Sequence, residues 1–276
     1  MADAVDVTRY LEAQGVEQAM SEAVQRALLE RPVNPIRRVG ELLLKAAARR
    51  RTDWANFAKL SCLEATPTAY KLIATQPSGK LIKMSLPVGA ADNPHGHPVH
   101  YMYVLTGARL AITHPMPDGT DRVDSVEMPP GAAIVLPEGP RQVKNIGNYD
   151  VEVLFVEPTG IKGSRVDCDV TPFQTNPEEY TIVAQDDAWL IGLCEIPPHA
   201  SDAPHSRRDH MIYVLSGESV RIHPMSNRGG EYVAMPGKEL TLPLHEGACL
   251  PVPAGHQCME NTGKETLRYV FWELKQ

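Results

Sequence analysis

Several features are scarce or absent in this sequence, and each absence excludes a class of protein. No apolar run in the 276 residues approaches 18, which excludes a membrane-spanning helix. Lysine and arginine (27) are fewer than aspartate and glutamate (34), so the whole chain lacks the positive charge that favours binding to nucleic acid or anionic membranes. The acidic start has no apolar segment and predicts no signal peptide.

Cysteine and aromatic residues are also informative by their scarcity. The five cysteines form no C-x-x-C pair, and this odd, scattered set predicts reduced thiols in the cytoplasm. Most of them are expected to be buried apolar fillers: Cys62, Cys168, Cys194 and Cys249. Aromatic residues make up only 6%, while prolines (24) outnumber glycines (20), which favours short strands separated by turns over much of the chain.

The first fifty residues have a different character. Apolar residues recur there at three- and four-residue steps, and two prolines divide them into two helical segments. The stripe consists of Leu11, Val16, Met20, Val24 and Leu28, and continues beyond Pro32 with Val39, Leu42 and Leu43. The pattern predicts a helical hairpin. About forty residues bury too little surface to fold alone, so the hairpin needs either a partner or the rest of its own chain.

The remainder of the chain consists of two copies of one sequence pattern. The segment from His100 to Gly107 matches the segment from His210 to Gly217 at an offset of 110. Glycine, proline and asparagine recur at an offset of 116, and both copies close on an apolar strand that ends in glutamate, at Glu157 and Glu273. Strand-length alternating runs between turn residues predict a sandwich or barrel in each copy.

At these residues the chain resembles a bicupin, a protein of two tandem cupin barrels. The first family motif is matched by Gly89, His95-Gly-His97 and Gly107, with His100 where the family has glutamate. The second is matched by Gly131, Pro137, Gly139 and Asn145, but Arg141 or Gln142 falls where the family has histidine. The resemblance implies a mainly β fold of two tandem jelly-roll-like antiparallel barrels after the α-helical hairpin, with domains at 1–52, 53–160 and 161–276.

The resemblance also implies a place for a metal. His95 and His97 share one face of a strand, and His100 can rejoin that face through a bulge. Three neutral imidazoles would leave coordination positions open on one divalent ion, namely iron, manganese, nickel or zinc. The alternative is a barrel mouth lined by solvated or hydrogen-bonded histidines, since the family's fourth ligand is missing.

The second copy is a weaker metal candidate. Its ligand set would be His205, His210, His256 and Cys258, a mixed nitrogen and sulfur set that favours zinc. Arg207 replaces the middle histidine and would repel a metal ion. Arg207 or Arg141 would instead suit an anionic ligand, and Gln142 is a candidate to complete or orient the first site.

The helical segment resembles the RIIa/Dpy-thirty dimerisation-docking motif. The similarity lies in Tyr10-Leu-Glu-Ala-Gln-Gly-Val, in Ala27-Leu-Leu-Glu-Arg-Pro32 and in the second proline, Pro35. It implies a homo- or heterodimer through the hairpin and a groove that receives an amphipathic helix of a scaffold protein.

Degenerate metal motifs together with a docking motif favour an assembly subunit over a free enzyme. The first hypothesis is therefore a structural adaptor in a ciliary or flagellar axoneme complex such as a radial spoke, with no catalytic residues and no nucleic-acid or membrane partner. The alternatives are a metal-dependent cupin enzyme, namely a dioxygenase or isomerase of a small molecule, and a small-ligand sensor.

Overall fold

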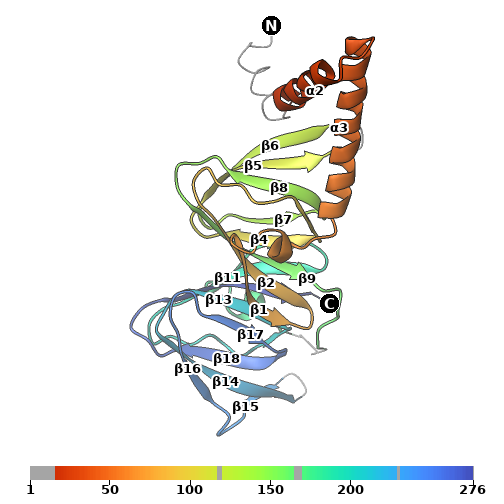
Figure 1. Ribbon diagram of the computed structural model, residues 1–276. Helices are drawn as coiled ribbons and strands as arrows, with labels where there is room; N and C mark the ends of the chain where they lie inside the picture. The colour runs from red at the N-terminus through yellow and green to blue at the C-terminus, as the bar shows by residue number, and fades with distance from the viewer. Residues whose placement is uncertain (1–15, 117–119, 165–169, 229–230, 276) are drawn as a thin grey trace.

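The structure, a computed structural model, describes residues 16–116, 120–164, 170–228 and 231–275 (Figure 1). Two helices, α2 (Val16–Glu30) and α3 (Pro35–Phe57), precede the β-structure. Asn34 caps α3, because its side-chain Oδ1 accepts the Arg37 amide hydrogen at 3.0 Å, and Pro35 suits the first helical turn. Leu11 lies outside the described residues.

The two helices pack on each other through small side chains. Ala23 and Ala27 of α2 are buried, whereas Met20, Val24 and Leu28, four residues apart, are exposed. The C-terminal end of α3 reaches the β-structure, where Ala58, directly after the helix, lies against Gly96. A side chain at position 96 would collide with the Ala58 carbonyl, which explains the glycine between two histidines.

The first β-unit, residues 62–158, begins with the short helix α4 (Cys62–Ala65). Its strands are β1 (Tyr70–Gln76), β2 (Gly79–Leu86), β3 (His95–His97), β4 (His100–Val104), β5 (Ala108–Pro115), β6 (Asp121–Met128), β7 (Ala133–Leu136), β8 (Gly139–Asn145) and β9 (Val151–Pro158). They form one sheet in the order β1-β2-β9-β4-β7 and a second in the order β3-β8-β5-β6.

The second β-unit, residues 172–274, repeats this plan after the short helix α5 (Pro172–Thr175). Its strands are β10 (Tyr180–Gln185), β11 (Trp189–Ile196), β12 (His205–Arg207), β13 (His210–Ser216), β14 (Ser219–Arg228), β15 (Glu231–Ala234), β16 (Leu240–Pro243), β17 (Cys249–Val252), β18 (Gly255–Asn261) and β19 (Leu267–Leu274). The sheets run β10-β11-β19-β13-β17 and β12-β18-β14-β15, with β16 also pairing with β14.

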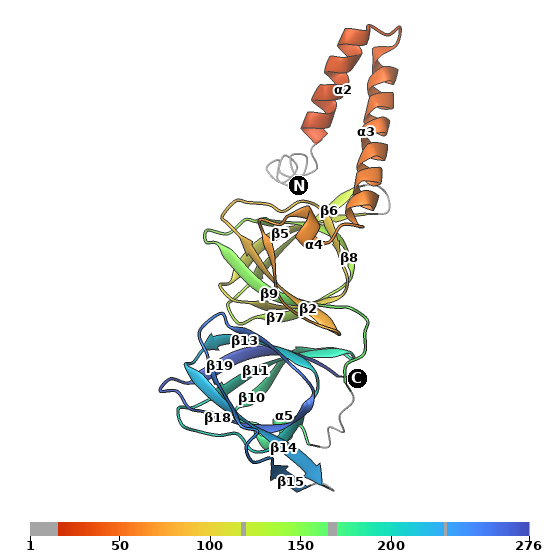
Figure 2. The ribbon, with the colours of Figure 1, turned by 60° about the horizontal axis from the view of Figure 1, so that its bottom comes forward.

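Each unit is therefore a pair of facing antiparallel sheets, the jelly-roll arrangement to which cupins belong. The prediction of a mainly β, cupin-type fold is confirmed. The prediction of closed barrels is corrected, because the strands of each unit divide into two separate hydrogen-bonded sheets. Figure 2 shows the two units stacked on each other, with the helices at the far end of the first.

The two units share a buried interface between their five-stranded sheets. Side chains from both units form one apolar cluster, which includes Leu81 and Leu154 of the first and Trp189 and Trp272 of the second. The Trp272 indole Nε1 donates to the Tyr101 carbonyl at 2.8 Å, so this buried polar group is also satisfied across the interface. The interiors between the sheets of each unit form two further clusters, and the candidate sites adjoin them.

Candidate functional site

Two strands from opposite sheets bring three histidines together in the first unit. His95 and His97 alternate with Gly96 on β3, so both point inward and are buried. His100 begins β4 in the other sheet, opposite Leu136 of β7. The predicted bulge is therefore absent from the described structure here: Pro98 and Val99 carry the chain from one sheet to the other.

The imidazole rings are held in defined orientations. Each Nδ1 lies next to an acceptor: the Asn93 carbonyl for His95 (2.7 Å), Glu157 Oε1 for His97 (2.7 Å) and the Pro98 carbonyl for His100 (3.0 Å). Nδ1 of His95 and of His100 must carry the hydrogen to donate to the carbonyl oxygens, which leaves their Nε2 atoms with a lone pair. Burial raises the pKa of Glu157, so either Glu157 or His97 Nδ1 can carry the hydrogen that they share.

His97 is the centre of the cluster. Its Nε2 lies 2.6 Å from Nε2 of His95, and its ring stacks on that of His100 with 4.5 Å between the centroids. At this distance one Nε2 donates a hydrogen that the other accepts, or a cation takes the place of that hydrogen. Burial lowers the pKa of His95 and lowers those of His97 and His100 well below the usual value, so a second proton on any one ring is disfavoured.

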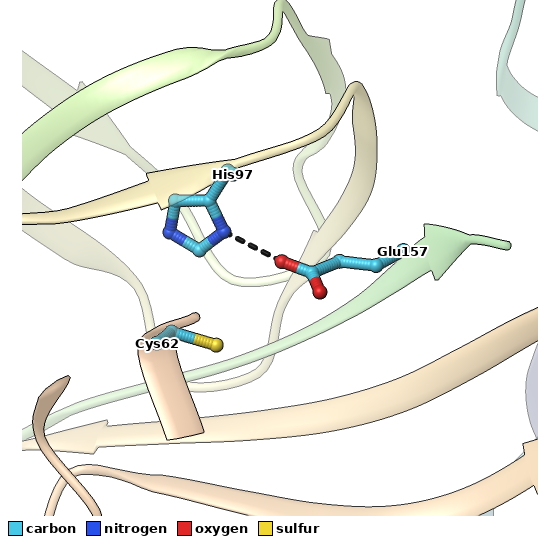
Figure 3. Close-up of side chains that lie close together, drawn as sticks. All are labelled: Cys62, His97 and Glu157. Atoms are coloured by element: carbon cyan, nitrogen blue, oxygen red, sulfur yellow. Dashed lines mark hydrogen bonds and ion pairs between the residues drawn. The ribbon is translucent and has the colours of Figure 1, made fainter. Parts of the chain in front are cut away.

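A carboxylate and a thiol complete this cluster (Figure 3). Cys62, His97 and Glu157 are buried, and each offers one ligand atom within 4.8 Å of the others. Glu157 comes from β9 and Cys62 from α4, far from the histidines in sequence. Among the described residues this is the one group of at least three histidine, cysteine, aspartate or glutamate side chains that meets this distance, so the first unit contains a possible metal site. Of the three predicted histidine ligands, the group includes His97 and not His95 or His100.

The sequence analysis missed two members of this group. Cys62 was expected to be an apolar filler, but its side chain faces the cluster; burial raises the pKa of its thiol, with a further contribution from the charge of Glu157. Glu157 was noticed only as the end of a repeated strand. Its recurrence as Glu273 was the available signal, since a glutamate that closes an apolar strand in both copies has a buried partner to satisfy.

Arg141 lies beside the histidines on β8, opposite His95. It is buried, one terminal nitrogen donates to the Pro137 carbonyl, and its Nε has no hydrogen-bond partner. Burial lowers the pKa of the guanidinium, although from a high ordinary value. A cavity of about 80 Å³ joins Arg141 to His97, His100 and Phe155, and its remaining walls are mostly aliphatic.

Gln142 is directed elsewhere. Its side-chain Nε2 donates to the Asp92 carbonyl at 2.8 Å. The Asp92 carboxylate accepts the hydroxyl of Tyr70 at 2.5 Å and the amide of Val143 at 2.6 Å, and burial raises its pKa to about 6. Gln142 therefore ties β8 to the segment before β3 and does not line the cavity.

The second unit places an arginine where the first has its central histidine. Arg207 is fully buried, and its Nε donates to Glu273 at 2.6 Å. Its guanidinium also lies 4.1 Å from the centre of the Phe271 ring. Burial opposes the charge of Arg207, but attraction to Glu273 outweighs it and raises the pKa of the guanidinium.

His205 and His210 keep the orientation of their first-unit counterparts. Their Nδ1 atoms lie 2.9 and 2.7 Å from the Ala203 and Arg208 carbonyls, and both Nε2 atoms are buried without a partner. Burial, and then the charge of Arg207, lowers the pKa of His205 to about 4 and that of His210 well below its usual value.

The predicted ligand set of the second unit is not brought together. His256 and Cys258 flank the inward-facing Gln257 on β18, so they belong to the other face of the strand. His256 Nδ1 instead lies 2.8 Å from the Ser206 hydroxyl. The structure thus separates them from His205 and His210 and fills the central position with the Arg207–Glu273 pair.

Comparison with known proteins gives matches to solved structures alone: no protein-family model and no curated protein matches the chain. Oxalate decarboxylase from Bacillus subtilis at pH 4.6 is 15% identical, with a TM-score of 0.49 over 74% of this chain and 70% of that chain. A structure used to study the Mn(II) centres of the same enzyme is 14% identical, with a TM-score of 0.49 over 74% and 71%. The formate complex of Lactobacillus farciminis oxalate decarboxylase is 15% identical, with a TM-score of 0.48 over 73% and 78%.

The prediction of a structural adaptor in an axoneme is wrong. The solved structures named above are of oxalate decarboxylases and not of radial-spoke or scaffold components. That prediction also rested on degenerate metal motifs, and Glu157 brings to the histidines a carboxylate that those motifs do not include. No helix among the described residues is long and apolar enough to cross a membrane.

Proposed function

We propose that the chain is a metal-dependent cupin enzyme whose first unit acts on a small molecule. The observation that carries this proposal is the state of His97. Its Nδ1 lies 2.7 Å from Glu157 Oε1 and its Nε2 lies 2.6 Å from Nε2 of His95, while burial lowers the pKa of both rings. Side chains held this close can share a divalent cation in place of a proton, and neutral imidazoles bind one without first losing a proton.

His97, Glu157 and Cys62 would hold the ion, with His95 and His100 next to them. The donor set fits iron or zinc, which accept imidazole, carboxylate and thiolate together. The bound metal would supply Lewis acidity, or redox chemistry in the case of iron. The chain itself contributes a closed, apolar surrounding that excludes water and fixed ring orientations that need no rearrangement.

The substrate we propose is a small carboxylate. Arg141 is a buried cation whose Nε lacks a partner, and it opens onto the cavity that His97 and His100 also line. A guanidinium in this position suits a planar anion. The cavity of about 80 Å³ has room for roughly half a dozen water molecules, which restricts the substrate to a few non-hydrogen atoms.

The duplication provides matched controls for the test. Purified protein is stripped of metal, reloaded separately with Fe(II), Mn(II), Ni(II) and Zn(II), and assayed for metal content and for consumption of oxygen and of small mono- and dicarboxylates, oxalate included. His95→Ala and Glu157→Gln should lose metal and turnover together. Their counterparts in the second unit, His205→Ala and the removal of the whole ion pair by Arg207→Met with Glu273→Met, should retain both. Retention of metal and turnover in the first pair, or equal loss in the second, contradicts the proposal.

We also propose that the chain pairs with a second copy through residues 1–52, ahead of functional regions at 53–160 and 161–276. The support is the exposed stripe of Met20, Val24 and Leu28 along one side of α2. Leu28 is 68% exposed, and a row of such side chains favours burial against a partner. The four described cysteines are free thiols, which agrees with a reducing cytoplasmic compartment.

A further inference from the structure

The second unit contains a cavity that its Arg207 centre does not use. It occupies about 320 Å³ between the two sheets, four times the cavity of the first unit. Aliphatic side chains form most of its wall, among them Val214, Val220, Ile222, Leu242, Leu250 and Val252. Leu240 of β16 also lines it and is half-exposed, so the cavity has a rim at the surface. Apolar volume of this size is stabilised when an apolar molecule fills it.

Amino-acid differences between equivalent positions of the two units explain why this cavity is separate from the buried charges. The strand register places Tyr269 where the first unit has Val153. Tyr269 is fully buried and lines the cavity, and its hydroxyl lies 3.2 Å from that of Tyr180. Arg207 is paired with Glu273, and neither residue belongs to the cavity wall. The wall contains no lysine, arginine, aspartate or glutamate among the described residues.

One amide side chain belongs to the otherwise mostly aliphatic wall. Gln257 of β18 is 8% exposed and lines the cavity, next to His256. It takes the place of Arg141, because each lies opposite the first histidine of its unit. The exchange replaces a cation by a neutral group that both donates and accepts. A buried amide of this kind is costly when unpaired, so a ligand that hydrogen-bonds to it gains affinity.

We propose that the second unit binds a small, uncharged, mostly apolar molecule with one hydrogen-bonding group, which Gln257 recognises. This site differs from the first in ligand class as well as in position. The first unit combines a cation with metal-binding side chains in a small cavity, and the second combines a neutral amide with a large aliphatic one. The chain then has two unlike binding sites on one duplicated fold, and the second does not depend on the proposed metal.

The test uses three naphthalene probes with the full-length protein at pH 7. Titration followed by probe fluorescence should show saturable binding of 1-naphthol and naphthalene at one per chain, and much weaker binding of the charged 1-naphthoate. Val252→Trp at the wall should abolish binding of both neutral probes. Its counterpart in the first unit, Leu136→Trp, should leave both unchanged, since the two residues lie opposite His210 and His100 respectively.

Gln257→Leu decides the role of the amide even if Val252→Trp fails to fold. It keeps the side-chain volume and removes the hydrogen-bonding group. The affinity for 1-naphthol should fall by about five- to tenfold, while that for naphthalene stays the same or rises. The proposal is overturned if the wild-type protein shows no saturable binding of the neutral probes, if naphthoate binds best, if Leu136→Trp abolishes binding, or if Gln257→Leu leaves the ratio of the two affinities unchanged.

Discussion

The buried centres of the two β-units differ at few positions, and those positions decide what each centre can hold. Both keep an outer histidine pair, His95 with His100 and His205 with His210, and both close with a buried glutamate. In the first unit the middle position is His97, and in the second it is Arg207. The neutral ring of His97 can bind a cation through a ring nitrogen. The guanidinium of Arg207 already places a positive charge at the equivalent position. The fold is shared, but the chemistry is set by single side chains.

The same comparison applies to the remaining partners. Cys62 on α4 corresponds in position to Pro172 on α5, which has no ligand atom to offer. Glu273 forms an ion pair with Arg207. Glu157 lies beside His97 instead, so it can orient that ring or bind a metal ion. We regard the Arg207–Glu273 ion pair as an internal substitute for the metal and its carboxylate ligand.

Exchanging the middle residues should have the largest effect. His97→Arg places a cation at the centre of the first site, and we expect loss of bound metal and a fall in turnover of at least about hundredfold. Arg207→His creates a third imidazole next to Glu273 and should allow a second metal ion per chain. Metal analysis of both variants measures the exchange. A His97→Arg protein that keeps its metal would contradict the claim that the middle residue decides which unit binds the ion.

Removing the ion pair of the second unit should have a large effect on stability. Arg207→Met leaves the Glu273 charge buried alone, and the free energy of unfolding should fall by about 3–5 kcal/mol. Arg207→Met combined with Glu273→Met removes both charges and should recover most of that loss. Urea unfolding of the three proteins provides the measurement. Equal stability of the single and double variants would show that the pair is not coupled.

Asp202 should make the second unit sensitive to pH. Burial raises its pKa to about 7, although it accepts hydrogen bonds from the Met259 amide and the Tyr180 hydroxyl. The folded chain thus holds this proton more tightly than the unfolded chain, whose aspartate titrates near 3.8. The contribution of Asp202 to the free energy of unfolding is therefore largest below pH 3.8. It falls as the pH rises above 3.8 and is lost once the pH has passed through about 7.

Asp202→Asn should remove the part of the pH dependence of stability that comes from this carboxyl group. Between pH 4 and 8 the wild-type protein should lose on the order of 4 kcal/mol of unfolding free energy relative to the variant. Chemical unfolding at several pH values measures the difference. A parallel pH dependence in both proteins would contradict the assignment. Asp92→Asn is the first-unit comparison and should act over a lower range, because the pKa of Asp92 is about 6.

The smallest expected effect concerns the helices, where neither unit is involved. Leu28→Asp places a charge in the exposed stripe of α2 and should weaken self-association by about tenfold, which corresponds to about 1.4 kcal/mol. Gln25→Asp, at another exposed position on the same helix, is the control. Sedimentation equilibrium gives both constants. Unchanged association in Leu28→Asp would rule out this stripe as the contact between copies.

The fold was largely predictable because its evidence is repeated in the sequence. Alternating apolar residues, turn glycines and an offset of 110 to 116 residues indicated two similar β-units, and His95, His97 and His100 share one buried centre as expected. The division into separate sheets was not predictable, since alternation alone does not distinguish a closed barrel from two facing layers. Strand pairing between distant segments decides that.

The composition of the site was less predictable, and so was the function. Cys62 and Glu157 are 35 and 60 positions from His97, so their proximity depends on tertiary packing. The prediction of His256 and Cys258 as ligands was wrong for a local reason. Successive residues of a strand point to opposite faces, so when Gln257 points inward its two neighbours point outward. The adaptor hypothesis combined a docking motif with degenerate metal motifs, and neither motif indicates that Cys62 and Glu157 lie beside His97.

The most direct test of the central claim is the location of metal in the wild-type protein. Crystals loaded with Fe(II) and measured by anomalous diffraction at the iron edge should show one ion beside His97 and Glu157 and no signal beside Arg207. A protein that takes up no ion, or an ion in the second unit with none in the first, would contradict the account.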